Sequence, residues 1–253
     1  MNHNTFSGLR SLIALENGRW TKSYNWLKSC LVWLTIFNGL MLLVLVYAPG
    51  LTGAAPDVAT GLNMVYQMLG GVCPIGAIII VHNSLISEKE NGTAAWVLSA
   101  PVSRASMIIS KLGVNLLYTT SITIVLQSVV SYYIIQYATN VSLPIASYYL
   151  GVAQMALYLA FWVTLTIMLG VVLDNRGTVM GTSLGIMYLH GPVANLASRY
   201  IPFIAQLMPS ALLNSAISSA TGGAFSPYAI IVVFMWIILF ALFACLRFEE
   251  LEL

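Results

Sequence analysis

The chain has 253 residues, of which 59% are hydrophobic and only 7% are charged. Soluble domains carry about a quarter charged residues, so this composition excludes a typical soluble protein and indicates an integral membrane protein. The formal net charge is +2, and the sequence contains no basic cluster that could neutralise the phosphates of a nucleic acid.

Six apolar runs are long enough to cross a bilayer as helices, which takes about 20 residues each. The short period-two segments of a transmembrane barrel are absent from the sequence. We therefore expect an all-α integral membrane fold in two parts, a cytoplasmic interfacial helix (1–26) and a six-span transmembrane domain (27–253). The spans are predicted at residues 27–47, 62–86, 106–137, 148–173, 178–195 and 228–246.

The segment before the first span has the pattern of an amphipathic helix. Leu9 and Ile13 recur at helical spacing, Arg10 and Glu16 occupy polar positions, and aromatic residues follow just before the apolar run. Such a segment lies along a membrane surface. We predict an interfacial helix on the cytoplasmic leaflet, with a solvated tail as the alternative.

The segment 82–111 is the one sizeable polar interruption between long apolar runs. Asn91 and Gly92 should end the preceding helix, and Thr93 is a suitable N-cap for a new one. Pro101 should close that new helix, which has room for about two turns. A short helix between two breakers, at a membrane surface and flanked by charge, suits docking to a soluble partner.

The letters of this segment also form a longer pattern: E-x-E-x-G-T, then W-x-L-S-x-P-V-S-R, then a lysine seven residues on. The pattern resembles the first cytoplasmic loop of ABC type-2 transporter permeases, which holds a coupling helix that binds a separate ATPase subunit. Trp96 departs from the family pattern, where a smaller or acidic residue is expected. An ordinary interhelical loop is the alternative. The residues predicted to couple to the ATPase are those that match the pattern together with Trp96 and Val97, the bulky residues of the short helix: Glu88, Glu90, Gly92, Thr93, Trp96, Val97, Leu98, Pro101 and Arg104.

The same resemblance implies a set of partners. The interfacial helix corresponds to the elbow helix of these permeases, and the chain would pair with a second permease subunit as a homodimer or heterodimer. Two copies of an ABC ATPase subunit would bind beneath and carry ATP and magnesium, whereas this chain would hold no cofactor.

The segment 198–226 is apolar but repeatedly interrupted by proline and glycine, so it is not predicted to span. Irregular apolar sequence at membrane depth must be covered by protein or line a cavity. We predict two short re-entrant or interfacial helices on the outer face, which the family resemblance also implies.

Basic residues set the expected orientation. With both termini in the cytoplasm, Arg199 is the only one of the 10 lysines and arginines that faces outside. This distribution agrees with the positive-inside rule. We expect an integral protein of the bacterial plasma membrane with cytoplasmic termini.

No catalytic constellation is visible in the sequence. A G-x-x-x-x-G-K-S/T phosphate-binding loop is absent, as are HEXXH and G-x-S-x-G, so the chain is predicted not to be an enzyme. His190 has methionines one turn and nearly three turns before it, but packing is favoured over a soft-metal site, and we predict no metal. The three cysteines have no CxxC spacing and are expected to be free thiols.

Uncharged polar residues and one histidine within the spans are candidates for a substrate path, and helix-to-helix hydrogen bonding is the alternative for each. We predict a permease subunit of an ATP-driven exporter for an amphipathic or hydrophobic cargo such as a drug, peptide or lipid. The alternatives are a six-span channel or regulatory scaffold without pump activity and, less favoured, a membrane enzyme. The path candidates are Asn38, Gln67, Gln127, Gln154 and His190.

Overall fold

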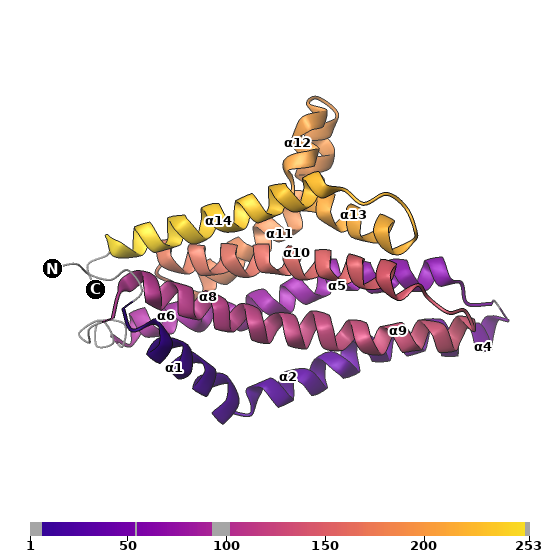
Figure 1. Ribbon diagram of the computed structural model, residues 1–253, viewed down its shortest axis with the longest axis horizontal. Coiled ribbons are helices and arrows are strands. Elements are labelled where there is room, and N and C mark those ends of the chain that lie inside the picture. The colour runs from indigo at the N-terminus through magenta and orange to yellow at the C-terminus, as the bar shows by residue number, and fades with distance from the viewer. Residues whose placement is uncertain (1–6, 54, 93–101, 251–253) are drawn as a thin grey trace.

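The computed structural model describes residues 7–53, 55–92 and 102–250, and the regular elements within these ranges are all helices. The helices form an elongated bundle, and most run along its long axis (Figure 1). Five of them are long and apolar enough to cross a membrane. These candidate spans are Trp26–Leu51, Val58–Glu90, Arg104–Thr139, Ile145–Val172 and Pro227–Glu249. The expectation of an all-helical integral membrane protein is confirmed.

The predicted span at 178–195 lies within α11 (Arg176–Ser198). This helix has 23 residues, which is long enough to cross, but its composition does not reach the hydropathy of the five candidate spans. Its glycines, His190 and Asn195 lower the hydropathy, and Pro192 lies within the helix. The structure thus provides five clear candidate spans and a sixth, more polar helix.

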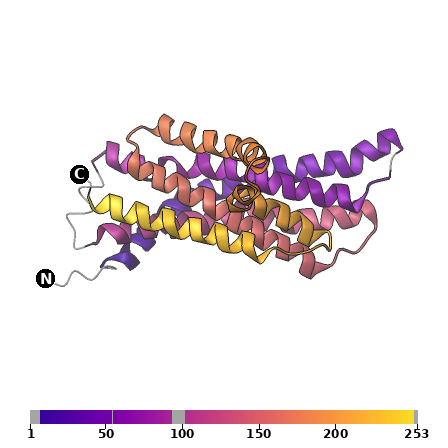
Figure 2. The same cartoon turned by 90° about the horizontal axis from the view of Figure 1, so that it is seen from above.

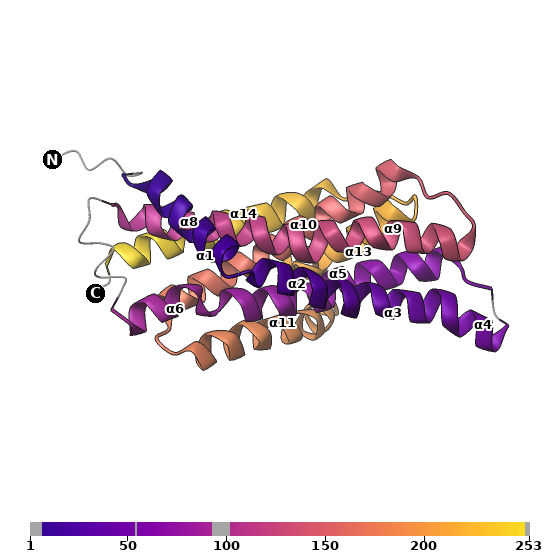
Figure 3. The same cartoon turned by 90° about the horizontal axis from the view of Figure 1, so that it is seen from below.

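The amphipathic segment forms α1 (Leu9–Lys22), which is followed at a sharp turn by α2 (Asn25–Trp33). Tyr24 makes the turn with a positive φ of 53°. Helix α1 packs on α8 (Arg104–Thr120), where the rings of Trp20 and Tyr118 stack with centroids 4.7 Å apart. Figure 3 shows α1 lying across the bundle beside α8.

Two candidate spans contain π-helical turns. The first consists of α2, η1 (Leu34–Asn38), α3 (Gly39–Leu42), η2 (Leu43–Tyr47) and α4 (Ala48–Thr52). The third consists of α8, η3 (Ser121–Val125) and α9 (Leu126–Thr139). π-helical turns widen a helix locally and often occur at functional sites.

The second candidate span begins and ends at residues that are typical of helix ends. Helix α5 (Val58–Val81) begins after Asp57, whose side chain accepts a hydrogen bond from the backbone amide of Thr60. Helix α6 (Asn83–Glu90) continues it and ends before Gly92, which has a φ of +66°. The predicted helix break at Asn91 and Gly92 is confirmed.

Helix α10 (Ile145–Val172) is the central element and contacts α5, α8, α11, α13 and α14. Its large side chains Tyr148, Tyr158 and Trp162 are fully buried. The last helix, α14 (Pro227–Glu249), lies along α10. The core of the molecule therefore follows the length of α10.

The segment between α11 and α14 holds two short helices, α12 (Pro202–Leu207) and α13 (Ser210–Ala220). Helix α13 packs against α10 and α5, whereas α12 projects sideways from the bundle (Figures 1 and 2). The sequence predicted two short helices here, and two are present.

One end of the bundle holds α1, α6, the beginning of α8 and the end of α14 (Figures 1 and 3). Most of the described charged side chains belong to these elements or to the turn before α11. We call it the charged end. It comprises Arg10, Glu16, Arg19, Lys22, Glu88, Lys89, Glu90, Arg104, Lys111, Asp174, Arg176, Arg247, Glu249 and Glu250.

Candidate functional site

Four charged side chains meet inside the charged end, and we call them the ion cluster: Glu16, Arg19, Glu88 and Lys111. The ammonium group of Lys111 lies 2.9 Å from Glu16 Oε1 and 2.9 Å from Glu88 Oε1. It also donates to the backbone carbonyl of Ser84 at 2.9 Å. Lys111 is fully buried, so its three donors meet three acceptors within the protein.

Arg19 completes the ion cluster from its exposed side. Its Nη1 lies 2.9 Å from Glu16 Oε1 and also donates to Glu88, and its side chain is 45% exposed. Burial lowers the pKa of Arg19, but the hydrogen bond to Glu88 and the charges of Glu16 and Glu88 outweigh it, so the pKa is raised. A raised pKa gives a contribution to stability that is complete below the unfolded-state pKa and lost only above it. The contribution of Arg19 is therefore constant across physiological pH.

The ion cluster attaches α1 to the bundle. Glu16 and Arg19 are three residues apart and share one face of α1, while their partners come from α6 and α8. Two negative and two positive charges balance inside the cluster. Removing one member of a buried ion pair costs about 3–5 kcal/mol, because the remaining charge is left without a partner.

The next two residues of α6 bind two other elements. Lys89 Nζ lies 2.6 Å from Asp174 Oδ1 and donates to the carbonyls of Val171 and Leu173 at 3.3 Å each. These carbonyls end α10, where a positive charge is favourable. The three consecutive charges at 88–90 thus bind different parts of the bundle, since Glu90 pairs with the beginning of α11.

The pair between Glu90 and Arg176 lies on the surface. Arg176 Nε is 2.6 Å from Glu90 Oε2, and the side chains of Arg176 and Glu90 are 44% and 38% exposed. Surface pairs of this kind contribute about 0–1 kcal/mol. The pair therefore serves as a contact between α6 and α11 more than as a source of stability.

Ser103 and Arg104, on the other side of segment 93–101, are also bound to other parts of the chain. Arg104 Nη1 donates to the carbonyls of Phe248 and Glu249, at 3.2 and 3.0 Å, at the end of α14. The amide of Ser103 donates to the carbonyl of Ser7 at 3.1 Å, and its hydroxyl caps α8 by accepting from Ser106 N. The segment 93–101 is thus flanked on both sides by residues bound to other helices.

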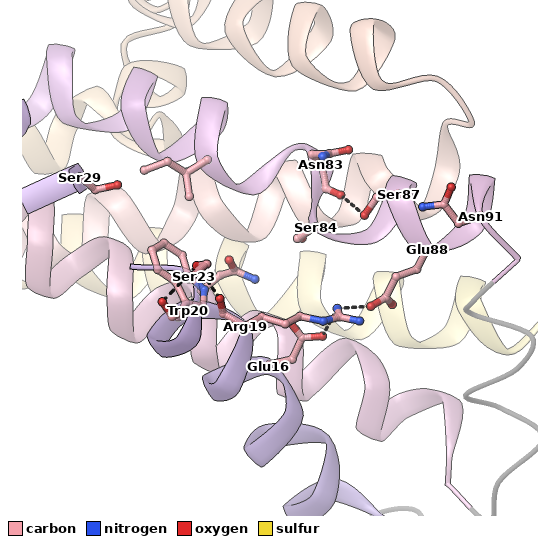
Figure 4. A pocket seen from close by; sticks show the side chains of 12 residues that line it. Glu16, Arg19, Trp20, Ser23, Ser29, Asn83, Ser84, Ser87, Glu88 and Asn91 are labelled. Atoms are coloured by element: carbon pink, nitrogen blue, oxygen red, sulfur yellow. Dashed lines mark hydrogen bonds and ion pairs between the residues drawn. The ribbon is translucent and has the colours of Figure 1, made fainter. Parts of the chain in front are cut away.

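A polar cavity of about 650 Å³ opens beside the ion cluster, between α1, α2, α5, α6 and α8 (Figure 4). Glu16, Arg19 and Glu88 line it, while Lys111 lies behind them. The remaining lining residues are Trp20, Ser23, Ser29, Ile80, Asn83, Ser84, Ser87, Asn91 and Asn115.

The residues expected to couple to an ATPase occupy different environments. Glu88 points inward and is 4% exposed, whereas Glu90 is on the surface and Arg104 binds the end of α14. Gly92 forms the turn after α6. The others, Thr93, Trp96, Val97, Leu98 and Pro101, lie outside the described residues.

Two of the expected substrate-path residues bind each other. Asn38 Nδ2 donates to Gln127 Oε1 at 2.7 Å, and Ser131 Oγ donates to Asn38 Oδ1 at 2.9 Å. Gln127 also donates to the carbonyl of Ile122 within η3 at 2.9 Å. Asn38 and Gln127 are buried, so here the polar groups join two candidate spans at their π-helical turns.

The other three path candidates lie in separate places. Gln154 Nε2 donates to Ser219 Oγ at 3.0 Å, and His190 Nε2 lies 3.2 Å from the hydroxyl of Tyr158. Gln67 is exposed on the surface of the single chain. None of the five candidates lines the polar cavity. The structure does not bring them together into one site.

The ion cluster itself was not predicted as a unit. Lys111 was the informative residue, because an ionisable residue within a predicted span (106–137) requires a partner. Glu16 and Arg19 share a helix face, but their spacing does not identify Glu88 as a partner. Glu88 lies 72 residues after Glu16 and 69 residues after Arg19.

The described residues contain no group of three or more His, Cys, Asp or Glu side chains that could hold a metal ion. Cys30, Cys73 and Cys245 are free thiols. Cys73 is buried and donates to the carbonyl of Thr123 at 3.0 Å.

The long apolar helices define an all-helical integral membrane protein. A comparison with protein families matches residues 26–252 to the family described as "Protein of unknown function (DUF2705)", and the chain belongs to that family. A comparison with curated proteins gives no match.

Proposed function

We propose that the chain is the permease subunit of an ATP-driven ABC exporter, which moves an amphipathic or hydrophobic substrate with energy from a separate ATPase subunit. The sequence resemblance of segment 88–111 supports the proposal. The observation that carries it is the attachment of both flanks of segment 93–101 to other helices, through Lys89 and Glu90 before it and Ser103 and Arg104 after it.

These contacts give a route for movement. A displacement of segment 93–101 by an ATPase would act on α6 and, through Lys89 and Glu90, on the turn between α10 and α11. It would also act on the end of α14 through Arg104. Coupling further requires that the ATPase prefer one conformation of the bundle, because a partner with equal affinity for both states shifts neither.

The proposal includes a topology and a second permease subunit. Helix α11 acts as the sixth span, the charged end faces the cytoplasm of a bacterial cell, and both termini lie there. Tyr200, Ile201 and Phe203, on the projecting turn and α12, are 81%, 53% and 56% exposed and offer an apolar surface to an identical or related permease. ATP and magnesium belong to the ATPase, and this chain performs no catalysis itself.

The test is the ATP hydrolysis of the purified complex. The complex is isolated from cells that make the chain, and its ATPase rate is compared with that of a complex carrying Trp96→Ala, which removes the largest side chain of the docking segment. We expect either the ATPase rate or its stimulation by substrate to fall about tenfold, which corresponds to a change of roughly 1.4 kcal/mol in free energy.

Tyr137→Ala is the matched control, because Tyr137 is 73% exposed at the other end of the bundle. An intact complex whose hydrolysis is unaltered by Trp96→Ala contradicts the coupling role. A channel or regulatory scaffold predicts instead that no ATPase copurifies.

A further inference from the structure

The polar cavity presents hydrogen-bond acceptors and a cationic donor to the same space at one end of the membrane-spanning bundle. We infer that it binds the phosphoethanolamine headgroup of a phospholipid, whose ammonium group meets the acceptors and whose phosphate meets Arg19. This lipid site is independent of the proposed transport activity.

The first argument is the supply of acceptors. Asn83 Oδ1 and Ser84 Oγ are buried side-chain atoms without a hydrogen-bond partner among the described residues, and both residues line the cavity. Buried polar atoms are nearly always satisfied, so such atoms at a cavity indicate a missing donor. The carboxylates of Glu16 and Glu88 line the same space (Figure 4). A primary ammonium offers three donors to these oxygens.

The second argument is the donor side. Arg19 lines the cavity with a side chain that is 45% exposed. Among the described residues, both of its ion pairs use the same nitrogen, Nη1. Its Nη2 and Nε groups remain as donors for a phosphate, which guanidinium groups bind well.

The balanced charge of the ion cluster favours a ligand that is a zwitterion. The ion cluster already contains two negative and two positive side chains. A ligand with a net charge would leave one charge without a partner in a partly buried site, which is unfavourable. A headgroup that carries one ammonium and one phosphate keeps the balance.

The shape of the site suits a lipid rather than a free small molecule. Along α5 and α6 the lining runs from Asn91 to Ile80, which corresponds to about 16 Å at 1.5 Å per residue. Ile80 is the lining residue of α5, and on the neighbouring α2 the lining extends to Ser29. On the same two helices, Ile79 of α5 and Leu31 of α2 are 50% and 59% exposed, so acyl chains have apolar surface to follow.

The experiment compares two phospholipids that differ only at the ammonium group. The full-length protein is purified in detergent, and its thermal unfolding is measured with phosphatidylethanolamine or phosphatidylcholine of identical acyl chains. Phosphatidylcholine carries three methyl groups in place of the three N–H donors. We expect phosphatidylethanolamine at saturation to raise Tm by about 5 °C more than phosphatidylcholine does. Equal shifts overturn the inference.

Two further ligands separate the other possibilities. Free phosphoethanolamine at the same concentration should give less than half the shift, and an equal shift would show that the lipid chains play no part. Phosphatidylglycerol tests the charge balance, since a larger shift with this anionic lipid contradicts the zwitterion.

A double variant localises the effect without altering the ion cluster. Asn83→Ala with Ser84→Ala removes the two unpartnered atoms, and the Tm difference between the two lipids should fall by more than half. Ser183→Ala is the matched control, because Ser183 Oγ is also buried and unpartnered among the described residues but does not line the cavity. A lipid difference that survives the double variant places the lipid elsewhere. No ATPase is present in these measurements, so their outcome is separate from that of the coupling test.

Discussion

Lys111 is fully buried, and three oxygens surround its ammonium group. Such a group is expensive to place inside a membrane protein, and it is retained where its partners are fixed. Glu16 and Glu88 are 7% and 4% exposed and face the polar cavity, so three of the four charges of the ion cluster have little exposed surface. Each of them depends on the others.

We predict that Lys111→Met lowers the free energy of unfolding by about 3–5 kcal/mol, because two buried carboxylates then lose their common cation. The measurement is denaturant-induced unfolding in mixed micelles, followed by tryptophan fluorescence. Lys22→Met is the control, since Lys22 is an exposed residue of α1, and it should change stability by less than about 0.5 kcal/mol. A variant at 111 that is as stable as this control would show that the ion cluster contributes nothing.

The packing of helix α1 on the bundle depends on Gly8, the residue before it, as well as on the ion cluster. Gly8 has a φ of +73°, and a Cβ atom there would lie 2.2 Å from Val102 Cγ1. Only glycine adopts this backbone conformation without strain and also allows residue 102 to approach so closely. The residues just before α1 and just before α8 therefore lie in close contact, and the amide of Ser103 also donates to the carbonyl of Ser7.

We predict that Gly8→Ala destabilises the docking of α1 by about 1–3 kcal/mol, the cost of a non-glycine residue in this region of φ. Hydrogen exchange of the α1 amides measures the effect, which should be largest in that helix. Gly18→Ala provides a control of opposite sign, because nothing lies within 4 Å of its Cβ position and alanine favours a helix by about 1 kcal/mol. Equal protection of α1 in both variants would refute the role of Gly8.

At the level of whole helices, much of the fold can be predicted because its determinants are local. The apolar runs determine five candidate spans, and Asp57, Gly92 and Asn175 set helix ends through short-range hydrogen bonds or backbone freedom. The partners within the candidate site cannot be predicted in this way. Asn38 and Gln127 are 89 residues apart, and no composition rule indicates that they pair where η1 ends and where α9 follows η3.

On the scale of the molecule, the distribution of charge along the bundle bears on its orientation. The charged end holds the ion cluster and the pairs of Lys89 and Arg176, whereas the other end carries Asp57 and uncharged residues such as Tyr137 of α9 and Asn140. Positively charged segments beside spans remain on the cytoplasmic side. In the proposed orientation, Gly92 and Ser103, which flank segment 93–101, face the side on which we propose that the ATPase binds.

We predict that a membrane-impermeant maleimide labels Asn140→Cys in intact cells but labels Lys22→Cys only after the cells are opened. Both variants are made in a chain whose native Cys30, Cys73 and Cys245 are replaced by serine or alanine, because these free thiols would otherwise react. Tyr137→Cys, at a position that is 73% exposed in the single chain, is a second site at the same end and should behave as Asn140→Cys does. Labelling of Lys22→Cys in intact cells would place the charged end outside. An ATPase in the cytoplasm could then not reach segment 93–101, so the exporter proposal would fail, while the lipid site would merely move to the other leaflet.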